Sequence, residues 1–139
     1  MDVSSQNTVA FLTALQDAMR QLRTIRATSV RRGAVGGPFF NLHGREPSSS
    51  AGGLSLGLGI KGSDGRTYDL EVEVLWNAER WTVNSGIYVD ADAGGQATVR
   101  ELPQRTASDL NGCIEHLRRA IDDLIGLQDL VPGANQGAG

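Results

Sequence analysis

The sequence predicts an α+β fold, a two-layer sandwich in which a four-stranded antiparallel meander carries an N-terminal and a C-terminal helix on one face. Apolar residues recur every three or four positions near both ends of the chain, as in amphipathic helices. Between these ends they alternate with polar residues, as in half-buried strands. The turns that join the alternating segments have the lengths that this pattern requires. The pattern also allows a fifth strand at the sheet edge.

The N-terminal segment repeats apolar residues at helical spacing, so we expect a helix whose apolar stripe faces the sheet. The stripe consists of Val9, Leu12, Leu15, Met19, Leu22 and Ile25. A segment rich in glycine and serine follows, residues 33–53, with an apolar island at Phe39, Phe40 and Leu42. Because Pro38 has no N–H to donate to a ladder, this island predicts a short strand at a sheet edge.

The alternating segments form the meander. Apolar residues occupy even positions in 54–60 and 68–76, and odd positions in 81–89. A weaker strand covers residues 97–102, with Thr98 and Arg100 on one side and Val99 on the other. Each strand is therefore expected to bury one face only.

Turn lengths test whether these faces agree, because residues directly opposite each other in an antiparallel pair share a face. The first hairpin pairs even positions with even ones and therefore needs a loop with an odd number of residues. The three residues Ser63–Gly65 form such a loop, and glycine is the last of them. The second hairpin pairs even with odd positions and therefore needs a loop with an even number of residues. This is either Asn77 and Ala78, or the four residues Asn77–Arg80. Pattern and turn chemistry thus predict the same registers.

The chain is expected to become helical again after Pro103. Thr106 and Asp109 stand at capping-box spacing. A stripe at helical spacing follows, consisting of Leu110, Ile114, Leu117, Ile121 and Leu124, and Gly126 is the expected helix end. We therefore predict one domain over residues 1–126 and a largely disordered tail over residues 127–139.

Composition limits the protein class. The chain has 139 residues, a net charge of −3 and one cysteine, which is typical of a single domain without an intrachain disulfide. The first residues show no basic stretch before an apolar run, and no apolar run is long enough to span a bilayer. We expect a cytoplasmic protein without a membrane segment, and the mild charge makes nucleic acid a less favoured partner than protein.

Catalytic and metal-binding patterns are weak. Cys113 and His116 stand three positions apart on the expected second helix, but Cys113 is beside the apolar stripe and near Glu115 rather than in an electropositive setting. We interpret the pair as structural. No catalytic residue, metal site or cofactor is predicted, and an enzyme is the less favoured class.

Two charged surfaces are the candidate sites. The open face of the sheet is the candidate for binding protein, with the residues Asp69, Glu71, Glu73, Thr82, Asn84 and Arg100. An arginine cluster without intervening acids is the candidate for binding anions, with the residues Arg20, Arg23, Arg26, Arg31 and Arg32.

These surfaces lead to three functional hypotheses. The first is a non-enzymatic protein-binding module that uses the open sheet face, by architectural analogy with inhibitors, immunity proteins and secretion-type chaperones. Its partner would be another protein or a second copy of the chain. The second is a nucleic-acid or anion binder that uses the arginine cluster. The third is a small-ligand cup or an enzyme, with its cavity between helix and sheet.

Overall fold

The computed structural model describes residues 5–28, 39–43, 52–91 and 94–132, and it confirms the predicted α+β sandwich. Side chains are described for residues 9–23, 52–91 and 94–132. The elements in chain order are α1 (Ser5–Thr28), β1 (Phe39–His43), β2 (Gly52–Lys61), β3 (Thr67–Trp76), β4 (Trp81–Asp90), β5 (Gln96–Glu101), β6 (Arg105–Ala107), α2 (Leu110–Gly126) and the 3₁₀ helix η2 (Gln128–Leu130).

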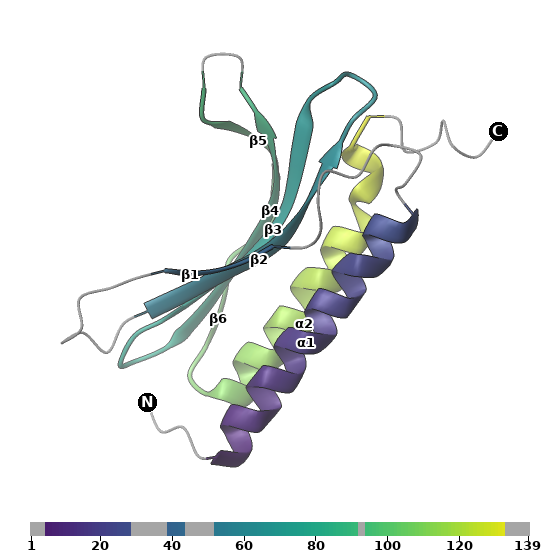
Figure 1. The fold of residues 1–139 in the computed structure, drawn as a ribbon. Helices are drawn as coiled ribbons and strands as arrows, with labels where there is room; N and C mark the ends of the chain where they lie inside the picture. Colours follow the sequence, from purple (N-terminus) through teal and green to yellow (C-terminus); the bar gives the residue numbers. More distant parts are fainter. Residues whose placement is uncertain (1–4, 29–38, 44–51, 92–93, 133–139) are drawn as a thin grey trace.

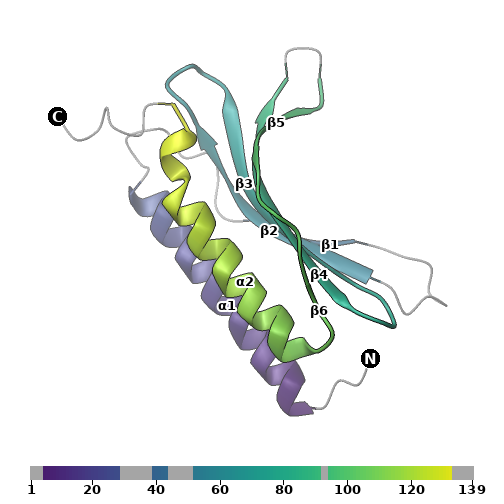
Figure 2. The ribbon, with the colours of Figure 1, turned by 180° about the vertical axis from the view of Figure 1, so that it is seen from behind.

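The strands form one antiparallel sheet in the order β1-β2-β3-β4-β5, and β6 pairs with another part of β4. The strand β1 lies at the sheet edge, where the apolar island was predicted to lie. The two helices lie side by side along one face of the sheet and run in the same direction (Figures 1 and 2). In the described part of the chain, no helix lies on the other face. Among the described residues, no helix is both long and apolar enough to cross a membrane.

The first hairpin has the predicted register. Even positions pair with even ones, as Leu56 does with Val72. The N–H of Gly62 donates to the carbonyl of Arg66 at 2.8 Å, which closes a three-residue turn between them. Gly65, the last residue of that turn, has a φ of 82°, a conformation that glycine adopts without the steric cost of a side chain.

The second hairpin also has the predicted parity, and it uses the longer of the two loops. Val74 pairs with Val83 and Trp76 with Trp81, so the four residues Asn77–Arg80 connect the strands. The Asn77 side chain accepts hydrogen bonds from two backbone N–H groups of this loop, at 2.8 and 2.9 Å. These bonds satisfy donors that the ladder leaves unpaired.

A β-bulge changes the third pairing. Tyr88 pairs with Thr98, whereas Ile87 pairs with Arg100, so β5 contains one extra residue at Val99. Beyond the bulge the parity is reversed, and Glu101 pairs with Gly86. The chain then pairs with the start of β4 as β6, a short strand that was predicted as the approach to the second helix.

The core lies between the helices and the inner face of the sheet. Its largest fully buried side chains come from α1, α2, three strands and the C-terminal segment: Leu22, Leu56, Leu58, Ile60, Leu70, Val72, Val74, Ile87, Leu117, Ile121, Leu124 and Val131. Each contributes about 1.5–3 kcal/mol relative to an exposed position. Trp81 is 5% exposed, and its ring centroid lies 5.6 Å from that of Phe11 and 5.5 Å from that of Trp76. The tryptophans thus lie at the hairpin end of the core.

The buried arc of α1 differs from the predicted stripe. Leu15 and Leu22 are buried as predicted, and Met19 is partly buried. Val9 and Leu12, however, are 63% and 53% exposed. The helix is turned toward Phe11, Ala14 and Ala18, because Phe11 packs on Trp81 and the small alanines let α2 approach closely. The side chain of Ile25 lies outside the described residues.

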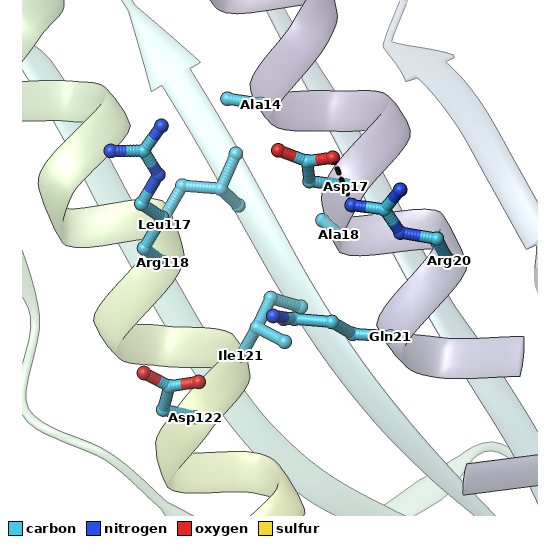
Figure 3. Close-up of a pocket in the computed structure, with 9 residues that line it drawn as sticks. All are labelled: Ala14, Asp17, Ala18, Arg20, Gln21, Leu117, Arg118, Ile121 and Asp122. Atoms are coloured by element: carbon cyan, nitrogen blue, oxygen red, sulfur yellow. Dashed lines mark hydrogen bonds and ion pairs between the residues drawn. The ribbon is translucent and has the colours of Figure 1, made fainter. Parts of the chain in front are cut away.

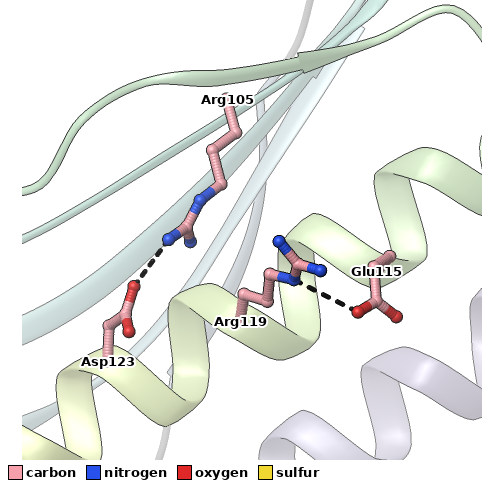
Figure 4. A network of polar contacts seen from close by, with 4 residues as sticks. All are labelled: Arg105, Glu115, Arg119 and Asp123. Atoms are coloured by element: carbon pink, nitrogen blue, oxygen red, sulfur yellow. Dashed lines mark hydrogen bonds and ion pairs between the residues drawn. The ribbon is translucent and has the colours of Figure 1, made fainter.

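The second helix begins three residues later than the capping-box pattern indicated. Asp109 is its N-cap, and the carboxylate accepts the N–H of Gly112 at 2.8 Å. Thr106 belongs to β6 and does not cap the helix. An ion pair between Arg105 and Asp123, at 2.8 Å, connects β6 to α2 (Figure 4).

The chain remains packed beyond the predicted domain end at Gly126. Val131 is completely buried, and the N–H of Ser63 donates to the carbonyl of Pro132 at 3.0 Å. The described fold therefore continues through residue 132, six residues beyond the predicted domain end. Residues 133–139 lie outside the described residues.

Candidate functional site

The open face of the sheet brings together most of the predicted protein-binding residues. Asp69, Glu71 and Glu73 project from β3 on this face, and all three are half-buried. Asn84 lies opposite Glu73, and Thr82 follows in the same row of β4. The parity of the pairing therefore places five of the six candidates on one surface.

Arg100 is the exception, and its predicted place among these residues was wrong. The bulge pairs it with Ile87, whose side chain is on the helix-facing side. Glu101 takes the open-face position opposite Gly86 instead. The local change is from a cation to an anion, so the open face of β3–β5 is more acidic than the sequence pattern indicated.

Side-chain amides bind the acids on this face. The Asn84 amide donates to Glu73 at 3.2 Å and accepts from Gln104 at 2.9 Å, and Gln96 donates to Asp69 at 2.5 Å. A carboxylate that already accepts such bonds offers fewer lone pairs to a partner. This hydrogen bonding favours the interpretation of the acidic row as a structured polar surface.

Tyr88 is the aromatic residue among these acids. A methyl group built on Gly86 would lie 2.8 Å from the Tyr88 hydroxyl oxygen, so the ring folds back over that glycine. Glu71 and Glu101 flank Gly86 on the two neighbouring strands. Burial raises the pKa of the Tyr88 phenol, and the negative charges of nearby glutamates raise it further. The tyrosine therefore remains a neutral hydrogen-bonding group at physiological pH.

Asp69 has a raised pKa for related reasons. Burial is the main cause and the negative charge of Asp90 adds to it, while the hydrogen bond from Gln96 acts in the opposite direction. The ionised carboxylate is thus disfavoured in the folded state relative to the unfolded chain.

Replacing Asp69 with asparagine is expected to raise the free energy of unfolding at pH 7. The raised folded-state pKa means that ionised Asp69 costs stability above that pKa, and the cost disappears as the pH falls below the unfolded value near 3.8. The amide oxygen of the variant can still accept from Gln96. Urea unfolding at pH 7 and pH 3 tests this, with Glu79→Gln, in the exposed turn, as the control. A variant less stable than the wild type at pH 7 would contradict the expectation.

The arginine cluster is only partly described. Arg20 and Arg23 are exposed on α1, and Arg20 is paired with Asp17 at 2.5 Å. Arg26 lies on the same helix, but its side chain is outside the described part, as are Arg31 and Arg32 entirely. The structure therefore neither assembles nor separates the five-residue cluster that the sequence indicated.

A surface that the sequence pattern missed lies beside these arginines. Val9 and Leu12 are the most exposed large apolar side chains of the described chain. Leu12, Leu15 and Met19 line an open hollow of about 680 Å³, and Arg20 and Arg23 also belong to its lining. We call Val9, Leu12, Met19, Arg20 and Arg23 the outer α1 face. Only the orientation of the helix could reveal it, since the same apolar residues had been assigned to the core.

A smaller hollow of about 170 Å³ lies between the two helices (Figure 3). Ala14, Ala18, Leu117 and Ile121 form its apolar part, and charged side chains of both helices surround it. The described residues that line this hollow and the larger one come from α1 and α2 alone. Neither hollow is the cavity between helix and sheet that a ligand cup requires.

Cys113 and His116 do not form a reactive pair. Cys113 is completely buried, and this burial raises the pKa of its thiol to about 12, far above physiological pH. His116 Nε2 lies 3.0 Å from the carbonyl oxygen of Thr106, a contact that fastens α2 to β6. Within the described ranges, no three His, Cys, Asp or Glu side chains are grouped to hold a metal ion.

Comparisons with models of protein families, with curated protein sequences and with solved structures each give no match.

Proposed function

We propose that this chain is a non-enzymatic protein-binding module. The observation that carries the proposal is the outer α1 face, where Val9 and Leu12 remain 63% and 53% exposed on a helix whose opposite side packs into the core. Contiguous exposed apolar surface beside polar residues is typical of interaction sites. The inert Cys113 thiol also supports a binding role over a catalytic one.

The outer α1 face is a better candidate for the binding surface than the open sheet face. On the sheet, Asp69 and Glu73 are half-buried and already accept hydrogen bonds from neighbouring amides. On α1, apolar side chains are in contact with water, so covering them gains free energy at about 25 cal/mol per Å². The open sheet face stays a second candidate surface for a basic protein, because its acids and Tyr88 form one continuous patch.

Affinity capture with matched variants tests the proposal. The double variant Val9→Thr with Leu12→Gln removes apolar surface without changing charge, and Glu71→Gln with Glu73→Gln changes the sheet face alone. We expect a protein captured from source lysate by the wild type to be lost with the α1 variant and kept with the sheet variant. The reverse pattern would move the site to the sheet. Capture that neither variant affects would contradict both surfaces.

Anion binding through the arginine cluster is the alternative function. It is supported by Arg23, an exposed side chain that has no ion-pair partner among the described residues. It predicts salt-dependent binding of nucleic acid that is lost on replacing Arg20 and Arg23 with glutamate. Unlike protein binding, it does not need the apolar side chains. Nucleic-acid binding by the Val9→Thr, Leu12→Gln variant at wild-type strength would therefore favour this alternative.

A further inference from the structure

The outer α1 face has two chemically different halves. Its N-terminal half presents Val9 and Leu12, and the partly buried Met19 follows Leu12 by seven positions. Its C-terminal half presents Arg20 and Arg23 at the edge of the hollow. Positions 9, 12, 16, 19 and 23 of this face follow each other at steps of three and four, which is the spacing that a second helix covers, and Gln16 stands between Leu12 and Met19.

From this arrangement we propose that the outer α1 face binds an amphipathic helix of another protein, with an apolar stripe that covers Val9, Leu12 and Met19 and with carboxylates that meet Arg20 and Arg23. The inference rests on the proposed function and specifies its partner. The face runs over 15 residues, from Val9 to Arg23, so about four helical turns of partner, near 21 Å, would cover it.

Charge complementarity identifies the partner as acidic. Arg23 has no ion-pair partner among the described residues. Arg20 is paired with Asp17, and its side chain is 74% exposed, so a partner's carboxylate can approach its guanidinium from solvent. Asp17 is the only acid in the sequence of α1. The edge of the hollow is therefore positive at the end where the partner's carboxylates would lie.

A second copy of the chain fits this face less well. In an antiparallel pair of α1 helices, the arginines of each copy would lie beside the partner's first turns, which contain no acid. A cation there is also opposed by the positive end of the helix dipole. The acidic sheet face of another copy would supply carboxylates but no apolar stripe. An acidic amphipathic helix supplies both.

Fluorescence anisotropy with the full chain and three labelled synthetic peptides tests the inference. The first peptide is a helix of about 15 residues with a leucine stripe flanked by glutamates. The second has the same stripe flanked by lysines, and the third is the first peptide in scrambled order. We expect binding of the glutamate peptide, binding of the lysine peptide that is weaker by roughly tenfold or more, and no binding of the scrambled peptide. Raising the salt should reduce the difference between the first two.

Three variants locate the binding on the chain. Val9→Thr with Leu12→Gln should weaken the binding of the glutamate peptide by roughly tenfold or more, because apolar contact is lost. Arg23→Glu should weaken the binding of the glutamate peptide and strengthen the binding of the lysine peptide. Arg100→Glu, on the distant strand β5, makes the same charge change and should alter the binding of neither peptide. The four substituted side chains are all exposed, and urea unfolding verifies that the variants remain folded.

Several results would overturn the inference. These are equal binding of the glutamate and lysine peptides, binding that the α1 variants leave unchanged, and a concentration-dependent dimer in size-exclusion chromatography that Leu12→Gln abolishes. The last result would mean that a second copy covers the face. If lysate capture depends on Leu12 but the glutamate peptide does not bind, the proposed function holds and only the acidic-helix partner is wrong.

Discussion

Replacing Trp81 with alanine is expected to lower the free energy of unfolding by about 3–5 kcal/mol. The ring is 5% exposed and lies between Phe11 of α1 and Trp76 of the neighbouring strand. Its removal leaves a cavity where the sheet meets the first helix. Because domains of this size have total stabilities of about 5–15 kcal/mol, the variant should be close to its unfolding limit.

Urea unfolding followed by circular dichroism measures this loss as a shift of the midpoint at constant slope. Trp76→Ala is the matched control, because it removes the same side chain from a partly buried position on the facing strand. We expect its loss of stability to be clearly smaller. Equal losses in the two variants, or a change below about 1 kcal/mol for Trp81→Ala, would show that this end of the core is packed differently.

A chain that ends at Gly126 is expected to lose about 3 kcal/mol of stability relative to the full chain. It lacks Val131, whose complete burial contributes about 1.5–3 kcal/mol, and the hydrogen bond from Ser63 to Pro132, which contributes about 0.5–1.5 kcal/mol. The same truncation would expose part of the β2–β3 hairpin end.

Leu130→Ala provides the control for the truncation, since this neighbouring side chain is 36% exposed and belongs to no buried cluster. The free energy of unfolding of this variant should be within about 0.5 kcal/mol of that of the wild type. Hydrogen exchange should show faster exchange of the Ser63 amide in the truncated chain only. Unchanged stability of the chain ending at Gly126 would restore the domain end that the sequence pattern indicated.

The registers of the first two hairpins were predictable because they depend on short-range features. Alternation of period two decides which side of a strand is apolar, and Gly65 or the Asn77 turn decides which residues face each other. Both signals lie within about ten residues of each other in the chain. The acids of β3 could be placed on the open face for the same reason, and Tyr88 and Asp90 share the even parity of Asn84.

Other parts of the candidate surfaces could not be predicted this way. The bulge at Val99 exchanges Arg100 for Glu101 on the open face, and no strong turn signal marks it. The strand β6 is only three residues long and depends on the free edge of β4 for its hydrogen bonds. A pattern that covers three residues is too short to distinguish from the approach to a helix.

Local periodicity therefore defines the two helices, the strands of the meander and the registers of its first two hairpins, because each of these follows from neighbouring residues and the geometry of one backbone element. The buried arc of α1 is different. Its sequence is apolar over a wide arc, so several orientations would bury similar area. The contact of Phe11 with Trp81 and the close approach of α2 at Ala14 and Ala18 select one of them. These are contacts between distant parts of the chain, and they leave Val9 and Leu12 exposed beside the arginines.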